Sequence, residues 1–402
     1  MKTLSRRLGA GLPRTVLALG LVSLLADVSS EMVYPLLPVL LTAGLGASAL
    51  ALGLVEGVAE TTAAVVKLLS GRWSDRLRRR KPLVVAGYGL AAAARPLIAF
   101  VASWPGVLVL RFVDRVGKGL RGAPRDALIA DATPLPRRAT AFGLHRAMDH
   151  AGAMIGPLLG AALVGWLGLS LPQVFLLTLV PGAATVVVLL LAVREEPREV
   201  TPSHGPLAVT GLAELPGSLR RLLLAILVFT LGNSTDAFLL LRLTETGAGV
   251  AGAALLWSAH HAVKMAGAAW GGRLGDRFSR RTVVLLGWGI YALCYGAFAL
   301  SAEAAVLAPV FLLYGLALGL AEPAEKAWIA DLAPQQGRGG AFGAYHATVG
   351  VAALPASLAG GALWLSVGPA ATFAAGALLA ALGAAMVLGV PAGPLRSTPA
   401  GR

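Results

Sequence analysis

Apolar runs long enough to cross a membrane recur from one end of this chain to the other. A helix needs about 20 mostly apolar residues to span a bilayer, where every backbone N–H and C=O must find its partner inside the helix. Hydrophobic residues make up 56% of the 402 residues and charged residues 13%, which leaves too little polar surface to cover a water-soluble fold. The sequence therefore predicts an all-α membrane protein with twelve transmembrane helices, near residues 15–43, 48–70, 83–103, 106–130, 139–166, 170–193, 221–244, 249–270, 282–301, 304–330, 340–365 and 370–390.

Basic residues are confined to alternate loops between these runs. Arginine and lysine crowd the loops after the second, fourth, sixth, eighth and tenth runs, whereas the intervening loops contain none. By the positive-inside rule, both chain ends then lie in the cytoplasm, and we expect a multi-pass protein of the cell inner (plasma) membrane. The same distribution accounts for the net charge of +14, so we expect membrane lipid, and no nucleic acid, to face it.

The two halves of the sequence repeat each other. Three short segments recur in the same order about 200 positions later: Gly71–Arg76 as Gly272–Arg277, Ile129–Asp131 as Ile329–Asp331, and Ala141–Gly143 as Ala341–Gly343. This duplication predicts two pseudo-symmetric six-helix bundles, residues 1–193 and 221–402, joined by a polar cytoplasmic linker at 194–220. Two such bundles in one orientation are typical of a secondary transporter, with the solute site near the midplane between them.

Two motifs give this architecture a family resemblance. The loop Gly71–Lys81 and its second copy, Gly272–Arg281, resemble motif A of the major facilitator superfamily. The segment Gly152–Gly160 resembles motif C, which is typical of the drug:H⁺ antiporters of that superfamily. The resemblance covers the whole chain and implies the superfamily fold, alternating access and proton-coupled efflux of a small molecule. It also implies a cytoplasmic gate made by Gly71, Asp75, Arg76, Gly272, Asp276 and Arg277.

The motif residues also have physical interpretations. Gly71 and Gly272 allow helices to approach closely, while Asp75 and Asp276 can cap helix N-termini or pair with arginine. We interpret the basic run Arg78–Lys81 as a topology signal that attracts anionic lipid. A small-residue face on the fifth helix, bent by a proline, is expected either to pack against a helix of the other half or to gate; it consists of Gly152, Gly156, Pro157 and Gly160.

Ionisable residues inside the apolar runs are the candidate site. Each costs about 2.5–3.5 kcal/mol at the helix centre on insertion scales, so such residues are paired or functional. We expect substrate binding and proton coupling from Asp27, Glu31, Glu60, Arg111, Arg115, Lys118, Arg121, Arg125, Asp126, Asp149, His150, Asp236, His260, Lys264, Glu322 and Lys326. A static network of mutually neutralising charges is the alternative.

Two details of the intramembrane charges bear on mechanism. The fourth helix departs from the superfamily's motif B, so its proton-coupling arginine is either Arg111 or Arg115. The offset of 200 sets Arg125 and Asp126 against Glu325 and Lys326 with the signs exchanged. We therefore expect a pair between Arg125 and Glu325 across the halves in one state of the cycle.

No sequence motif supports catalysis or a cofactor. The chain has no Walker A, GxSxG, HExxH or CxxC sequence, and its one cysteine, Cys294, lies in an apolar run. We expect a monomer that binds a small molecule and protons. We expect no enzyme activity, cofactor or metal. Uptake or symport of an organic anion is an alternative, and a receptor or a membrane-embedded enzyme on the same scaffold belongs to another class.

Overall fold

The computed structural model describes residues 11–37, 40–47, 49–197, 215–233, 236–243 and 249–392, and in these ranges it is helical with no strand. The first half contains α2 (Arg14–Glu31), α4 (Ala49–Asp75), α5 (Lys81–Leu97), α6 (Trp104–Ala132), α7 (Arg138–Gly165), α8 (Leu171–Leu177) and α9 (Leu179–Ala192). The second contains α10 (Gly217–Gly232), α11 (Asp236–Leu243), α12 (Gly249–Arg277), α13 (Arg280–Leu300), α14 (Ala304–Leu332), α15 (Arg338–Ser366) and α16 (Pro369–Val387).

The helices follow the predicted runs except where the chain breaks them. The first run ends as an α-helix at Glu31 and continues as a 3₁₀ turn at Tyr34–Leu36, because Pro35 lacks the N–H that a helix needs. The sixth run is two helices, α8 and α9, that meet at Thr178. The seventh divides into α10 and α11 at Asn233. The twelve-helix fold is confirmed.

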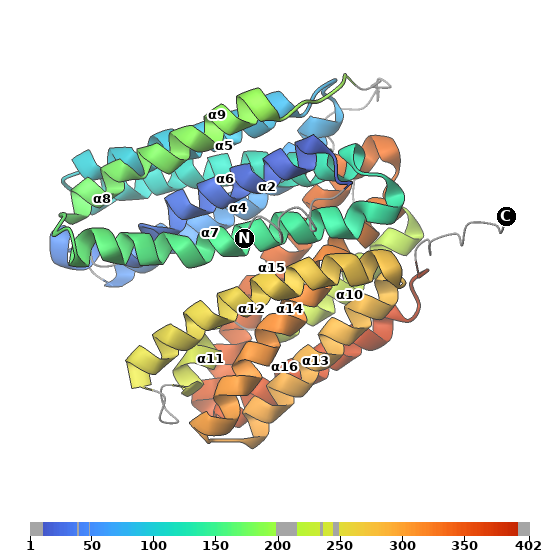
Figure 1. Ribbon diagram of the computed structural model, residues 1–402. Coiled ribbons are helices and arrows are strands. Elements are labelled where there is room, and N and C mark those ends of the chain that lie inside the picture. The colour runs from blue at the N-terminus through green and yellow to red at the C-terminus, as the bar shows by residue number, and fades with distance from the viewer. Residues whose placement is uncertain are drawn as a thin grey trace.

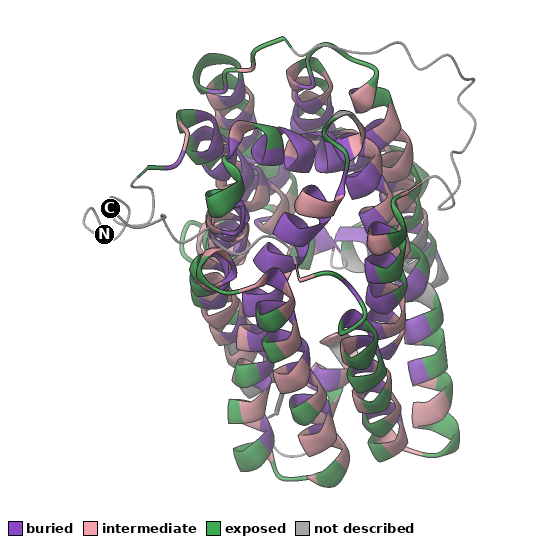
Figure 2. Cartoon of the chain, turned by 90° about the vertical axis from the view of Figure 1, so that its right-hand side faces the viewer, coloured by how far each residue is buried: buried purple, intermediate pink, exposed green. Residues whose placement is uncertain are grey.

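The helices form two bundles that meet along α4, α6, α7, α12, α14 and α15 (Figure 1). Among the described helices, eight are long and apolar enough to cross a membrane on their own, and α4 and α6 are not among them. Both of these helices lie where the halves meet, and α6 packs between α4 and α5. Its charged residues are mostly buried in protein rather than turned to lipid, as the cost of a lipid-facing charge requires. Figure 2 shows that buried residues gather on the inner faces of the helices and exposed residues on the outer faces.

The linker between the halves begins with a docked residue. Glu195 accepts hydrogen bonds from the backbone N–H groups of Arg80 and Lys81, both at 2.7 Å, and so caps the start of α5. The predicted linker at 194–220 therefore begins in contact with the first half, and residues 198–214 lie outside the described ranges.

The glycine face of α7 packs within its own half. A Cβ placed on Gly152 would lie 2.6 Å from the carbonyl oxygen of Leu24, and one on Gly156 would lie 2.8 Å from the backbone nitrogen of Met32, both in α2. The expectation that this face meets the other half is wrong. The absent side chains bring α2 and α7 into backbone contact, and Pro157 lies inside the same stretch of α7.

Substituting Gly160 by alanine tests this packing. The new Cβ would overlap the carbonyl oxygen of Met32, so we expect a loss of about 1–3 kcal/mol of stability and a lower Tm of the purified protein. Gly165→Ala is the matched control, since a Cβ there meets nothing within 4 Å. Equal Tm values for the two variants would contradict the packing.

Candidate functional site

Two carboxylates join the halves at one end of the bundles, which we call the basic end because the arginine-rich loop at residues 76–80 lies there. Asp75, at the end of α4, accepts the backbone N–H groups of Gly339 at 2.9 Å and Gly340 at 2.6 Å, in the first turn of α15. Asp276, at the end of α12, accepts two N–H groups at the start of α7, at 3.0 and 2.9 Å. Each carboxylate satisfies orphan donors of a helix N-terminus that belongs to the opposite half.

A chain of ion pairs surrounds the first of these contacts. Arg80 pairs with Asp75 at 2.8 Å and also with Asp131 at the end of α6. Asp131 in turn pairs at 2.5 Å with Arg338, which begins α15 of the other half. We call Asp75, Arg80, Asp131 and Arg338 the first latch.

The same arrangement is repeated in the second half. Arg280 pairs with Asp276 at 2.9 Å and with Asp331 at 3.1 Å. Asp331 pairs at 2.8 Å with Arg138, which begins α7 of the first half. These four residues form the second latch. The two latches are related by the sequence repeat, because Asp131, Arg138 and Arg80 each recur 200 positions later.

The latch geometry corrects two predictions. The interpretation of Arg78–Lys81 as a topology signal is wrong for Arg80, whose side chain is fully buried, and for Lys81, whose amine donates to carbonyl oxygens at the end of α9. The arginines that pair with Asp75 and Asp276 are Arg80 and Arg280, whereas Arg277 of the predicted gate stands over the ring of Phe278 at 5.7 Å. The spacing from aspartate to arginine, nearly equal in both repeats, was the signal that could have revealed them.

Glycines bring the helices of the two halves together beside the latches. A Cβ on Gly272 would lie 2.6 Å from the carbonyl oxygen of Ala139, and one on Gly143 would lie 2.8 Å from the Cα of Gly272. Gly71 contacts Gly339 in the same manner in the other repeat. The basic end is therefore closed by backbone contact as well as by charge.

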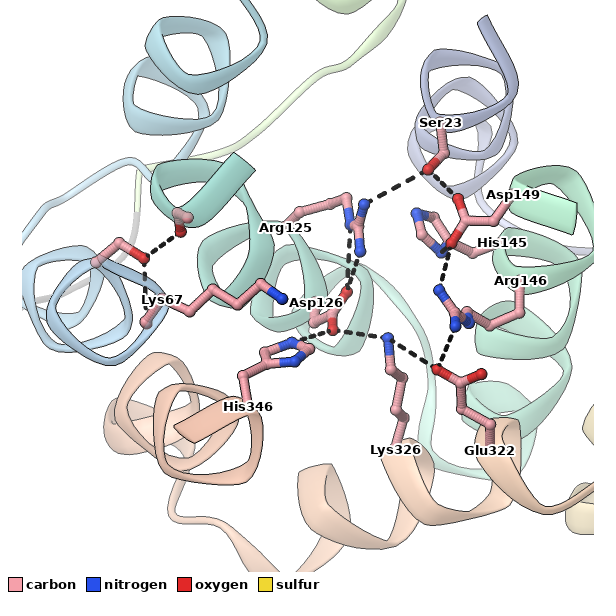
Figure 3. Close-up of polar contacts among 12 residues, drawn as sticks. Ser23, Lys67, Arg125, Asp126, His145, Arg146, Asp149, Glu322, Lys326 and His346 are labelled. Atoms are coloured by element: carbon pink, nitrogen blue, oxygen red, sulfur yellow. Dashed lines mark hydrogen bonds and ion pairs between the residues drawn. The ribbon is translucent and has the colours of Figure 1, made fainter. Parts of the chain in front are cut away.

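A second set of cross-half ion pairs lies nearer the middle of the helices (Figure 3). Asp126 of α6 pairs with Lys326 of α14 at 2.9 Å. Arg146 of α7 pairs with Glu322 of α14 at 2.7 Å. Lys326 also lies 3.9 Å from Glu322, so the two pairs form one continuous layer of charge across the interface.

Asp126 has further partners in both halves. Arg125 contacts it at 3.1 Å, and Nε2 of His346 in α15 lies 3.0 Å away. The expected pair between Arg125 and Glu325 is not formed in this structure, where Glu325 instead accepts the indole N–H of Trp288 at 2.7 Å. The repeat alignment set the right two segments against each other, but Asp126 and Lys326 make the contact rather than Arg125 and Glu325.

Asp149 and its neighbours extend this layer into the first half. Asp149 accepts a hydrogen bond from Ser23 of α2, pairs with Arg146 at 2.7 Å and lies 3.6 Å from the ring of His145. The next residue is His150, whose ring lies 5.8 Å from that of His261 in α12. The layer thus connects α2 through α7 to the opposite half.

Asp27 and Glu31 lie on the α2 face that the glycines of α7 contact. A Cβ on Gly152 would lie 2.8 Å from the Cβ of Asp27, and one on Gly156 would lie 2.8 Å from that of Glu31. Both acids are half-buried, and the described residues give neither an ion-pair partner within 4 Å. They are carboxyl groups at membrane depth, where an ionised form needs a partner or water.

Most cations of α6 have acidic or aromatic partners. Arg111 lies 3.7 Å from Asp114, which Arg95 of α5 also contacts, at 2.9 Å. Arg115 pairs at 3.2 Å with Glu60 of α4, whose side chain is 63% exposed. Arg121 stacks its guanidinium over the ring of Tyr88 at 4.2 Å.

The predicted contacts of the second half lie mostly inside an aromatic cluster. His260 is fully buried, with Nδ1 3.1 Å from the carbonyl oxygen of Phe311 and its ring stacked on Trp257. Tyr314 donates to Asp236 at 2.5 Å. His260 is therefore not a cavity-lining residue in this state, while Lys264 is only half-buried; Ser234 and Thr235 lie outside the described ranges.

Comparison with known proteins gives matches along most of the chain. A family model described as the Major Facilitator Superfamily matches residues 19–243 and 222–402. An uncharacterised MFS-type transporter of Methanocaldococcus jannaschii is 33% identical over 384 residues, which cover 94% of this chain and 95% of the relative. An uncharacterised protein of Mycobacterium tuberculosis is 32% identical over 375 residues, 89% of each chain.

Solved structures share the fold at low sequence identity. The human organic anion transporter MFSD10 superposes with a TM-score of 0.78 and 18% identity, over 93% of this chain and 99% of that one. The Escherichia coli fucose:proton symporter gives 0.75 and 16%, over 93% and 97%. At these identities the likeness concerns the arrangement of helices alone.

Neutralising Asp75 tests the first latch. Asp75→Asn removes charge-assisted hydrogen bonds and the Arg80 pair, so we expect the basic end to open about ten times more often. The reporter is maleimide labelling of Ala341→Cys, a buried position in α15, in purified Cys294→Ser protein. Glu303→Gln, at the far end of the helices, is the control, and an unchanged labelling rate for Asp75→Asn would contradict the latch.

A double-substitution cycle tests the pair at mid-depth. Asp126→Asn and Lys326→Met each leave a buried charge without its partner, so we expect the combined loss of Tm to be smaller than the sum of the single losses. Asp126→Asn combined with Lys264→Met should be additive. Additivity in both cycles would show that the cross-half pair has no energetic coupling.

Proposed function

Because the chain belongs to the major facilitator superfamily, we propose that this membrane transporter carries a small solute across the bilayer by alternating access, coupled to protons. One observation carries the proposal. A layer of ion pairs joins the halves at mid-depth, next to two latches that close a single end. Opening that end requires both latches to separate, which is a rigid-body movement of one half against the other.

We propose that the basic end is the cytoplasmic end and the plasma membrane the location. The positive-inside rule supports this orientation, since the loops at the other end carry no arginine or lysine. The closed latches then correspond to an outward-facing state. The exposed side chain of Glu60, beyond the mid-depth layer, agrees with a solute path open to the outer side.

The proposed proton carriers are Asp27 and Glu31. Their position beside the backbone of α7 keeps them half-buried, and neither forms an ion pair within 4 Å among the described residues. A carboxyl group in that setting binds a proton when the surrounding water is withdrawn and releases it when water returns. Alternation of the two halves would change their access to water from one side to the other.

For direction, we propose export of the solute in exchange for protons. The motif C glycines support it, since they attach α7 directly to the helix that carries the two acids, so that bending at Pro157 and protonation act on the same contact. A second candidate is uptake of an organic anion together with protons, which the cations along α6 favour. The human structural neighbour, an organic anion transporter, shows that the fold accommodates such a solute.

Removing one acid tests proton coupling. In proteoliposomes, solute addition should move protons across the membrane, with the sign of the pH change separating exchange from co-transport. Asp27→Asn cannot carry a proton at that position, so we expect solute-dependent pH change to be lost while the protein inserts normally. Glu303→Gln should behave as the unmodified protein, and full proton movement by Asp27→Asn would exclude Asp27 as a carrier.

A further inference from the structure

One face of α6 carries a nearly continuous row of cations. Arg111, Arg115, Lys118 and Arg125 are spaced by four, three and seven residues, which places them on one side of a helix. The seven-residue gap is divided by Gly122, which would be the next member of the row. Gly122 is therefore the one position of the row without a side chain, about one helical turn from Lys118.

A lysine from the neighbouring helix fills that position. A Cβ built on Gly122 would lie 3.4 Å from Cγ and 3.5 Å from Cε of Lys67, so the aliphatic stem of Lys67 passes over the glycine. Next to it, Gly119 receives Val66 in the same way, with a built Cβ 2.5 Å from its Cβ. Lys67 of α4 thus adds a fifth positive charge to the row, at the position of Gly122.

The row contains more cations than its acids can neutralise. Ion pairs join Asp114 to Arg111, Glu60 to Arg115 and Asp126 to Arg125, as described above. Each of these acids therefore already has a cationic partner. In the described part of the chain, neither Lys67 nor Lys118 has an ion pair within 4 Å. Lys118 is the charged group that acts most strongly on Lys67, and Glu60 is the nearest acid that acts on both.

The mid-depth layer does not supply the missing anion. Figure 3 shows the Lys67 amine directed toward Arg125, Asp126 and His346, with no contact drawn from its nitrogen. Asp126 is already shared among Arg125, Lys326 and His346. Ammonium groups without an ion-pair partner are costly at membrane depth, and a bound anion would remove that cost.

We propose that Lys67 and Lys118 form the binding site for an anionic group, a carboxylate or a phosphate, of the transported solute. The inference rests on the proposed solute transport but not on its direction. An ammonium group is a compact charge with three donors, suited to either oxyanion. Asp27 and Glu31 of α2 act electrostatically on Lys118, so protonation of these acids favours a bound anion there.

Binding to the purified full-length protein tests the site without any transport assay. The probes are benzoate, phenyl phosphate, succinate and inorganic phosphate, with benzyl alcohol and benzylamine as the matched neutral and cationic compounds, at constant ionic strength. The readout is the rise in Tm with ligand concentration. We expect at least one anion to stabilise the protein and the neutral and cationic compounds to leave Tm unchanged. Comparison of the phosphates with the carboxylates identifies the preferred group.

Substitutions assign that binding to the two lysines. Lys67→Gln and Lys118→Gln should each weaken the anion's apparent affinity about tenfold or more, the effect of one charged hydrogen bond, whereas Lys67→Arg and Lys118→Arg should retain it. Lys67→Met keeps the stem over Gly122 and replaces Lys67→Gln if the latter does not fold. Arg273→Gln, an exposed cation of the opposite half, should leave the affinity unchanged.

Three results would overturn the inference: no stabilisation by any anion, stabilisation by benzyl alcohol or benzylamine alone, or anion binding that both glutamine variants retain. Proton movement driven by a neutral solute in proteoliposomes, combined with any of these, would leave the proposed function standing and refute the anion site alone. Loss of solute-dependent proton movement with the lysine-dependent anion binding intact would refute the proposed function and leave the anion site standing.

Discussion

An ionised side chain inside a bilayer has no water to solvate it, and the architecture of this protein follows from that constraint. The most charged helix, α6, lies between α4 and α5 rather than at the lipid surface. Its acids and bases reach partners on five other helices, two of them in the opposite half. The same pairs that make buried charge tolerable therefore also hold the halves together in one state.

The internal repeat is used in two different ways along the interface. At the basic end, the repeated residues have the same sign, so each half contributes an aspartate and an arginine and the latches form twice, crosswise. At mid-depth, the repeated positions have opposite signs, and Asp126 pairs directly with its own counterpart, Lys326. Duplication gives a symmetric closure, while divergence after duplication gives a single asymmetric contact at the depth where the solute is expected.

The walls on the two sides of the interface differ in chemistry. The first half presents cations along α6 together with the acids of α2, whereas the second half places His260, Tyr314 and Asp236 in an aromatic cluster where they bind one another. A solute between the two halves would meet the charges of α6 and α2 on one side. On the other side it would meet polar groups that are hydrogen-bonded within an aromatic cluster. This asymmetry explains why the proton and anion sites are both proposed in the first half.

Local composition determined the helices, the duplication and the list of charged residues, because apolar length, loop charge and repeated segments are written along the chain. Motif residues such as Asp75 were also found, since capping and pairing depend on residue type. Only the tertiary structure decided which charges meet: that Arg80 is buried rather than a topology signal, that Gly160 contacts α2, and that Asp126 rather than Arg125 crosses the interface. Adjacent residues on a helix point about 100° apart, so a pairing is set by helix rotation and crossing, which no single segment of sequence encodes.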